Sequence, residues 1–247
     1  MRETRILMGM PITIEIVDAQ DGALIERAFE YLVAVDHRFS TYKPDSEITA
    51  INAGRIAVAD CSAEMREVLA IAETTRWETL GFFDIKRADG SLDPSGIVKG
   101  WAIRNTARLL SESGARNFYV DAGGDIQPVG RNAEGAEWRT GIRDPFHTDR
   151  IVKTIYPRGR GVATSGTYVR GQHIYNPHDR SNVVDDIVSL TVIGSDVLEA
   201  DRFATAAFAM GQDGIQFIEA QPGLEGYLID SAGIATMTSG FEALTQL

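Results

Sequence analysis

The sequence has one cysteine, no basic stretch and no long apolar run, and each absence excludes a class of protein. Cys61 stands alone among 247 residues, so the chain forms neither an intramolecular disulfide nor a cysteine metal cluster. Lys and Arg number 24 against 35 Asp and Glu, and the net charge of -11 argues against a nucleic-acid partner. No apolar run approaches the roughly 20 residues of a membrane helix, so we expect no membrane insertion.

The first eleven residues, MRETRILMGMP, also lack an apolar segment of signal-peptide length, which predicts a cytoplasmic protein. Hydrophobic residues make up 44% of the chain, which is ample for a buried core. No linker-like stretch or repeat divides the sequence, and we expect one domain over residues 1–247.

Helical and strand patterns are interspersed without strict alternation, which predicts an α+β fold with mixed, mainly antiparallel sheets and packed helices. Runs rich in β-branched and aromatic residues predict strands at 11–17, 82–85, 117–122, 138–143, 151–156, 183–193, 226–229 and 234–237. Apolar residues at three- and four-residue spacing predict five helices. They begin after Asp21, after Asp45 or Ser46, after Ser62, near Ser95 or Gly96, and after Ser195.

Residues 93–101, DPSGIVKGW, place an acid, two glycines and a lysine at the start of one of these helices. Asp93 and Ser95 are suited to cap its free amides, and Gly114 is a natural stop. Lys99, one turn inside, can face an incoming anion. The stretch indicates an anion site, although a capped helix start with a solvated lysine fits the same residues.

Asp201 and Thr205 are four residues apart on the last long predicted helix, so they lie on the same side of it. A carboxylate and a hydroxyl are oxygen donors that suit Mg²⁺, and they leave positions for a phosphate, a backbone carbonyl and water. The alternative is a helix in which the hydroxyl bonds back to its own backbone and the carboxylate meets water or a neighbouring arginine.

Other polar and aromatic segments have similar double interpretations. Tyr42, Phe82 and Phe83 could stack on an aromatic ligand or pack in the core. His173, with an ordinary pKa near 6.5, is suited to general acid–base work or to a structural hydrogen bond in a loop. The segment Gly123-Gly124-Asp125 could shape a site through its backbone, but it is most simply a chain turn.

Eight short blocks occur in one order along almost the whole chain, and together they resemble the ApbE family of FAD:protein FMN transferases. The blocks are MG at 8–9, YKPDSEI at 42–48, FFD at 82–84, DPSGIVKG at 93–100, DAGGDI at 121–126, ATSGTY at 163–168, HIYNP at 173–177 and EADRFATA at 199–206. The resemblance implies an α+β enzyme that uses Mg²⁺, cleaves FAD at its pyrophosphate, moves FMN onto a Thr or Ser hydroxyl of a target flavoprotein and releases AMP.

The resemblance also implies roles for individual residues. Asp201, Thr205 and the backbone carbonyl of Gly96 match the metal ligands. His173 and Lys99 match the positions expected to act at the transfer step. The remaining matches line the FAD site of the family: Met8, Tyr42, Phe82, Phe83, Asp84, Asp93, Lys99 and Ile174.

The chain departs from the family pattern at several places, one of them Gly96, where alanine is commoner. Asp84 and Asp93 are only nine residues apart, which predicts a trimmed wall of the FAD pocket, and residues 178–181 lack the usual glycine. Two other functions fit the same residues: a Mg²⁺-dependent FAD pyrophosphatase that gives FMN and AMP, and a flavin-binding protein without catalysis.

Overall fold

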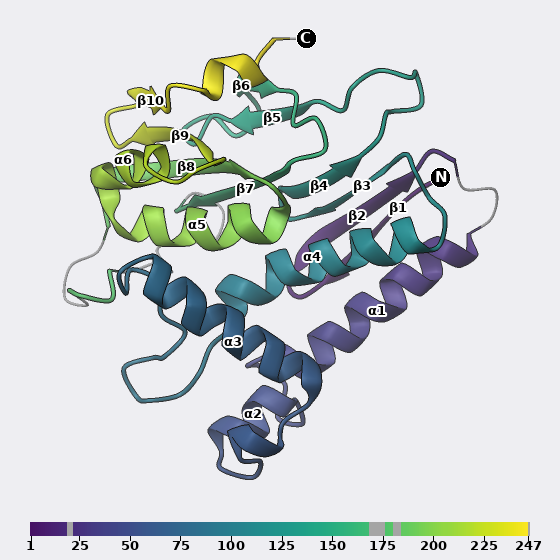
Figure 1. The fold of residues 1–247 in the computed structure, drawn as a ribbon, viewed down its shortest axis with the longest axis vertical. Helices are drawn as coiled ribbons and strands as arrows, with labels where there is room; N and C mark the ends of the chain where they lie inside the picture. The colour runs from purple at the N-terminus through teal and green to yellow at the C-terminus, as the bar shows by residue number, and fades with distance from the viewer. Residues whose placement is uncertain (19–21, 168–175, 180–183, 247) are drawn as a thin grey trace.

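A computed structural model describes residues 1–18, 22–167, 176–179 and 184–246, and within them an eight-stranded antiparallel sheet forms the centre of the fold (Figure 1). The strand order is β1-β2-β3-β4-β7-β8-β9-β10, and β5 pairs with β6 in a separate ribbon. The strands span Arg2–Leu7 (β1), Met10–Ile16 (β2), Phe118–Ala122 (β3), Asp125–Val129 (β4), Thr140–Arg143 (β5), Ile151–Ile155 (β6), Gly161–Gly166 (β7), Ile187–Gly194 (β8), Glu225–Asp230 (β9) and Ala235–Met237 (β10).

Helices α1, α4 and α5 lie along one side of the sheet, while β5, β6 and the C-terminal segment lie on the other (Figure 1). The helices span Ala23–Phe39 (α1), Glu47–Asn52 (α2), Ala63–Glu78 (α3), Ser95–Glu112 (α4), Val197–Ala209 (α5) and Gly214–Glu219 (α6), with short 3₁₀ helices at Val58–Asp60, Gly211–Asp213 and Phe241–Leu244. The predicted α+β class is confirmed.

The burial of each strand explains its sequence. In β2, MPITIEI, buried residues alternate with less buried ones because only one face meets the helices. In β8, IVSLTVIG, nearly every residue is buried, because α5 and α6 cover one face while β6 and the C-terminal 3₁₀ helix cover the other. Long apolar runs and alternating runs therefore mark the centre and the margin of the same sheet.

Two tight turns lie at one end of the sheet. Met8 and Gly9 join β1 to β2 with φ of +50° and +73°, and Gly123 and Gly124 join β3 to β4 with φ of +64° and +100°. Turns of this kind need positive φ at both central residues, which glycine adopts without strain. Because Ile12 pairs with Ala122, both turns lie at the same end of the sheet.

Several local predictions were wrong. Residues 82–85 form a loop rather than a strand, because their backbone continues from the end of α3 into a closed turn held by the bridge between Lys86 and Leu92. The side chain that caps α5 belongs to Asp196, which accepts from the Glu199 amide, and not to Ser195. The N-cap of α1 is Gly22.

Other predicted boundaries were right. Ser46 caps α2 and Ser62 caps α3, each accepting from the amide three residues on. Helix α4 begins at Ser95 and is followed by Gly114, whose φ of +100° ends it. The N-cap of α4 is Pro94 without a side-chain hydrogen bond, but Asp93 Oδ1 accepts from the Ser95 amide at 3.1 Å.

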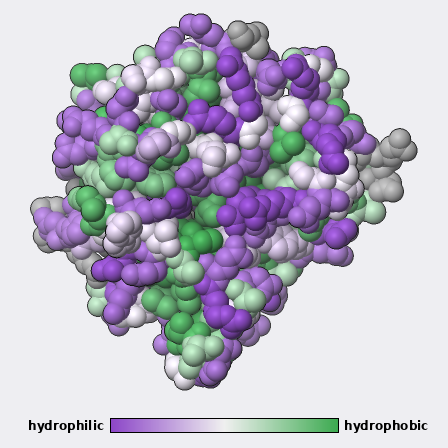
Figure 2. All heavy atoms as spheres, in the orientation of Figure 1, coloured by the Kyte–Doolittle hydropathy of each residue, from purple (hydrophilic) through white to green (hydrophobic). Residues whose placement is uncertain are grey.

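None of the helices in the described part of the chain is long and apolar enough to cross a membrane. The face shown in Figure 2 is mostly hydrophilic, with hydrophobic residues in smaller groups between the polar ones.

Candidate functional site

Two glycines of α4 let this helix approach α5 unusually closely. A Cβ on Gly100 would lie 2.9 Å from both the Leu198 Cα and the Asp201 Cβ, and a Cβ on Gly96 would lie 3.7 Å from the Thr205 Cγ2. Gly96 therefore faces Thr205 while Gly100 faces Asp201, so the two helices run antiparallel across this contact. The contact brings the metal-binding pair predicted on α5 against the helix that carries Lys99.

Lys99, Asp125 and Asp201 form a buried ion cluster at this helix contact. The Lys99 ammonium contacts Asp125 Oδ2 and lies 3.1 Å from Asp201 Oδ1, while the two aspartate side chains are each 2% exposed. Backbone amides hold the remaining oxygens: Thr164 donates to Asp125 Oδ1 at 3.0 Å and Gly100 donates to Asp201 Oδ2 at 2.9 Å. The cluster joins α4, α5, β4 and β7, which are distant in sequence.

The cluster contains two carboxylates and one ammonium, so its formal charge is -1. Burial, together with the charge of Asp125, raises the pKa of the Asp201 carboxyl to about 7, against the opposing effect of the Lys99 ammonium. Buried negative charge of this kind is stabilised by an added cation.

The donors around Asp201 fit the chemistry of Mg²⁺. Asp201 offers a carboxylate, and Thr205, one turn further along α5, offers a hydroxyl. The regular helical pattern directs the Gly100 amide to the carbonyl of Gly96, and here that amide donates to Asp201. The backbone of Gly96, which faces Thr205 across the helix contact, carries the carbonyl predicted as a further ligand.

Phe82 and Phe83, both predicted to line an FAD site, lie in different surroundings. Phe83 is buried, and its ring carbon Cε2 would lie 3.0 Å from a Cβ on Gly96, so it packs directly beside the α4–α5 contact. Phe82 is partly buried and makes an edge contact with the ring of His178, with centroids 4.7 Å apart. Only Phe83 is therefore brought to the predicted metal donors by the described contacts.

Asp84 and Asp93 stand at the two ends of a closed turn. The Asp93 amide donates to the Ile85 carbonyl at 2.8 Å, which draws the ends together. Asp84 accepts from the Lys86 amide and lies 3.6 Å from the guanidinium of Arg76. The Asp93 carboxylate pairs with Arg87. The short spacing noted in the sequence is therefore accommodated by a turn with both carboxylates at its base.

The other predicted site residues are less closely connected. Met8 lies in the β1–β2 turn, at the end of the sheet where the glycine turn before Asp125 also lies. Tyr42 is 93% exposed on a loop after α1, so its ring does not belong to the core. His173 and Ile174 lie outside the described residues.

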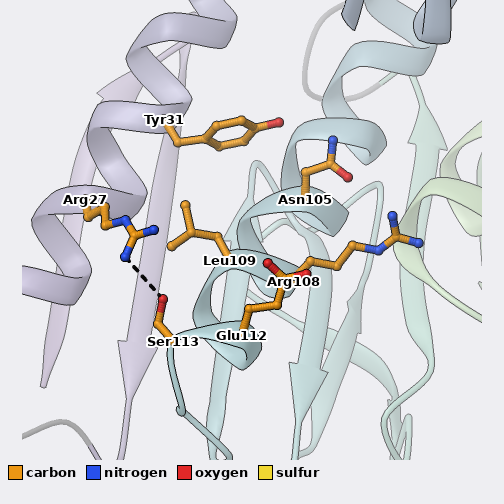
Figure 3. Close-up of a pocket in the computed structure, with 7 residues that line it drawn as sticks. All are labelled: Arg27, Tyr31, Asn105, Arg108, Leu109, Glu112 and Ser113. Carbon is orange, nitrogen blue, oxygen red and sulfur yellow. Dashed lines mark hydrogen bonds between the residues drawn. The ribbon is translucent and has the colours of Figure 1, made fainter.

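A pocket of about 600 Å³ lies elsewhere, between α1 and the C-terminal half of α4 (Figure 3). Its lining includes Arg27, Tyr31, Asn105 and Arg108, and burial raises the pKa of the Tyr31 phenol to about 12. Arg108 lies nine positions after Lys99 on α4, which is about 13.5 Å along the helix axis. The pocket is thus distinct from the ion cluster.

Asp125 is the residue that sequence reasoning missed. Its position directly after two glycines favoured a simple turn, and the turn is present. The same turn starts β4 with a buried acid that reaches the ammonium of Lys99. The available signal was the acid itself, since a charged residue at the first position of an apolar strand needs a partner.

His178 is a second residue whose place the sequence did not indicate. Its Nε2 lies 2.9 Å from the Leu80 carbonyl oxygen, and its ring packs on Phe82. The described segment 176–179 is thereby fixed to the turn that follows α3.

Comparisons with known proteins all point to one protein family. Residues 8–89 and 85–228 match the ApbE family. A Klebsiella pneumoniae protein named FAD:protein FMN transferase is 29% identical over 202 residues, which cover 78% of this chain and 57% of that protein. The Vibrio cholerae protein of the same name is 34% identical over 131 residues, covering 49% of this chain and 39% of that protein. The chain spans about half the length of these relatives.

Solved structures support the fold. The flavin transferase ApbE from Vibrio cholerae superposes with a TM-score of 0.85 at 24% identity, covering 99% of this chain and 98% of that chain. The ApbE protein from Thermotoga maritima gives a TM-score of 0.87 at 20% identity, covering 100% and 99%.

Proposed function

This chain belongs to the ApbE family, and we propose that it transfers the FMN half of FAD to a threonine or serine hydroxyl of a target flavoprotein, with Mg²⁺ bound and AMP released. The observation that carries the proposal is the buried ion cluster beside the oxygen donors of α5. Such a cluster supplies both parts that a transfer at a pyrophosphate needs: an ammonium for the phosphate charge and donors for a divalent cation.

In this proposal Asp201, Thr205 and the carbonyl of Gly96 hold Mg²⁺, which when bound neutralises charge on the pyrophosphate. Lys99, whose side chain is 19% exposed, presents its ammonium to the phosphate oxygens from the second turn of α4. Phe83, packed beside Gly96, excludes water from the metal donors. The close packing of α4 on α5 fixes the spacing between the ammonium and the carboxylate.

The remaining residues of the FAD site are assigned by their match to the family pattern. Polar and backbone contacts to FAD come from Met8 in the β1–β2 turn and from Asp84 and Asp93 in the closed turn before α4. Apolar contacts come from Phe82, Tyr42 and Ile174. The arginine partners of Asp84 and Asp93 hold these carboxylates at the base of the closed turn.

The transfer step moves one group between two oxygens. The acceptor hydroxyl oxygen forms a bond to the phosphorus on the FMN side while the bond from that phosphorus to the bridging oxygen breaks. AMP leaves with the bridging oxygen, and the hydroxyl proton passes to His173 as general base. Lys99 offsets the negative charge that the phosphoryl oxygens carry throughout.

The proposal is tested by incubating the protein with FAD, Mg²⁺ and a flavoprotein domain that carries an acceptor threonine. We expect the target mass to rise by one FMN, with one AMP released for each, and EDTA to stop both. The control target carries Val in place of the acceptor threonine.

The alternatives give different products in the same assay. Equal amounts of free FMN and AMP, with no change in target mass for several acceptor domains, would identify a pyrophosphatase. Bound but intact FAD would identify a binding protein. H173A should lower the transfer rate more than FAD affinity, since its role lies in the transition state.

A further inference from the structure

We propose that Asp125 is a positioning residue that holds the Lys99 ammonium away from full pairing with Asp201 and thereby keeps the Asp201 carboxylate available to a divalent cation. The inference rests on the metal assignment of the proposed function and adds to it a residue outside the ligand set. Neither the family comparison nor the resemblance of the sequence assigns a role to Asp125.

The geometry shows why one lysine needs two acids here. Lys99 contacts Asp125 directly and lies 3.1 Å from Asp201 Oδ1. An ammonium and a divalent cation compete for the same carboxylate oxygens, because both are attracted by the same charge. Without Asp125 the ammonium has a single anionic partner in the cluster, and that partner is the proposed metal ligand.

The surroundings of Asp125 suit it to hold the Lys99 ammonium. It is 1% exposed, and among the described residues its Oδ2 has no hydrogen-bond partner besides the ammonium of Lys99. Its Oδ1 accepts from the Thr164 amide at 3.0 Å, which fixes the carboxylate on the sheet. A buried carboxylate anchored in this way holds the lysine at a set distance from α5.

The net charge of the cluster also makes Asp125 favourable for cation binding. The three side chains sum to -1, and replacing Asp125 by Asn brings the sum to zero. A neutral pair of Lys99 and Asp201 attracts a divalent cation less than an anionic cluster does. Removing the lysine as well returns the sum to -1 and leaves Asp201 without a competitor.

The test measures Mn²⁺ affinity by electron paramagnetic resonance in the absence of FAD, for wild type, D125N, K99M/D125N and the control D121N. Asn keeps the acceptor for the Thr164 amide, so D125N preserves the anchoring hydrogen bond. Asp121 lies on the same hairpin and accepts from the Gly124 amide at 2.8 Å, a bond that Asn also preserves. Circular dichroism confirms that each variant is folded.

We expect D125N to bind Mn²⁺ about 10- to 100-fold more weakly, as for other residues that orient the groups around a metal. K99M/D125N should recover most of this affinity but not the rate of FMN transfer, since the phosphate-binding ammonium is gone. D121N should bind Mn²⁺ like wild type. Recovery in the double variant is not expected of a merely structural residue.

Wild-type affinity in D125N, or no recovery in K99M/D125N, would overturn the inference while leaving the transferase proposal intact if the wild-type protein modifies its target. A wild-type protein that binds no Mn²⁺ and transfers no FMN would overturn both.

Discussion

Substitution of Gly100 by Ala tests whether the close contact of α4 and α5 sustains the site. A Cβ at this position would meet the Leu198 Cα at 2.9 Å and Asp201 Oδ2 at 3.1 Å. The first neighbour is backbone, so it cannot rotate away, and the two helices must separate. The matched control is G96A on the same helix face, where the three nearest atoms belong to the side chains of Phe83 and Thr205, the closest at 3.0 Å.

The magnitude follows from two opposing effects. Overpacking against fixed backbone costs up to about 3 kcal/mol, and Ala in place of a helical Gly returns about 1 kcal/mol. We therefore expect G100A to lower the free energy of unfolding by about 2 kcal/mol, which corresponds to a fall in Tm of about 4–8 °C for a chain of this length. G96A should change the free energy of unfolding by less than about 1 kcal/mol, since a side chain can yield.

Urea unfolding of the two variants, followed by circular dichroism, measures this difference at an unchanged m-value. The same shift moves Asp201 away from Lys99, so FMN transfer by G100A should fall by up to about 100-fold, the loss that a displacement near 1 Å causes. A G100A protein as stable and as active as G96A would refute the claim that helix spacing sets the site.

Three further predictions concern single side chains. In EDTA, D201N should be more stable than wild type, because the substitution removes a buried carboxylate. Mg²⁺ at one hundred times Kd should stabilise wild type by about 2.7 kcal/mol and should not stabilise D201N, as measured by urea unfolding. T205A should bind Mg²⁺ about tenfold more weakly by calorimetry, a loss of about 1.4 kcal/mol, while T205S keeps the hydroxyl and the affinity. Burial raises the pKa of Tyr31 from 10.0 to about 12, so the folded protein loses stability as pH rises from 10 through 12. Between about pH 9 and pH 11 the free energy of unfolding of Y31F should therefore fall by about 1 kcal/mol less than that of wild type. Equal losses would contradict the assignment.

The helices could be predicted because their signals are local. Ser62 and Ser46 cap helices through amides three residues away, and Gly114 ends α4 by its own backbone conformation. The loop at 82–85 was mistaken for a strand because aromatic residues favour strands, whereas here Phe83 is buried against Gly96 from an irregular segment. At this segment the packing of Phe83 in the core outweighed the strand propensity of the aromatic residues.

The sequence by itself determined the α+β class, most helix boundaries, the family resemblance and the pairing of Asp201 with Thr205 on one helix face, because periodicity and residue order carry that information along the chain. Only the tertiary structure decided that Asp125 meets Lys99 and that Gly100 lies against Asp201. These contacts join segments separated by strands and turns, and they depend on the order of strands in the sheet and on the distance between two helices. No local pattern fixes either quantity, since both follow from how the whole core packs.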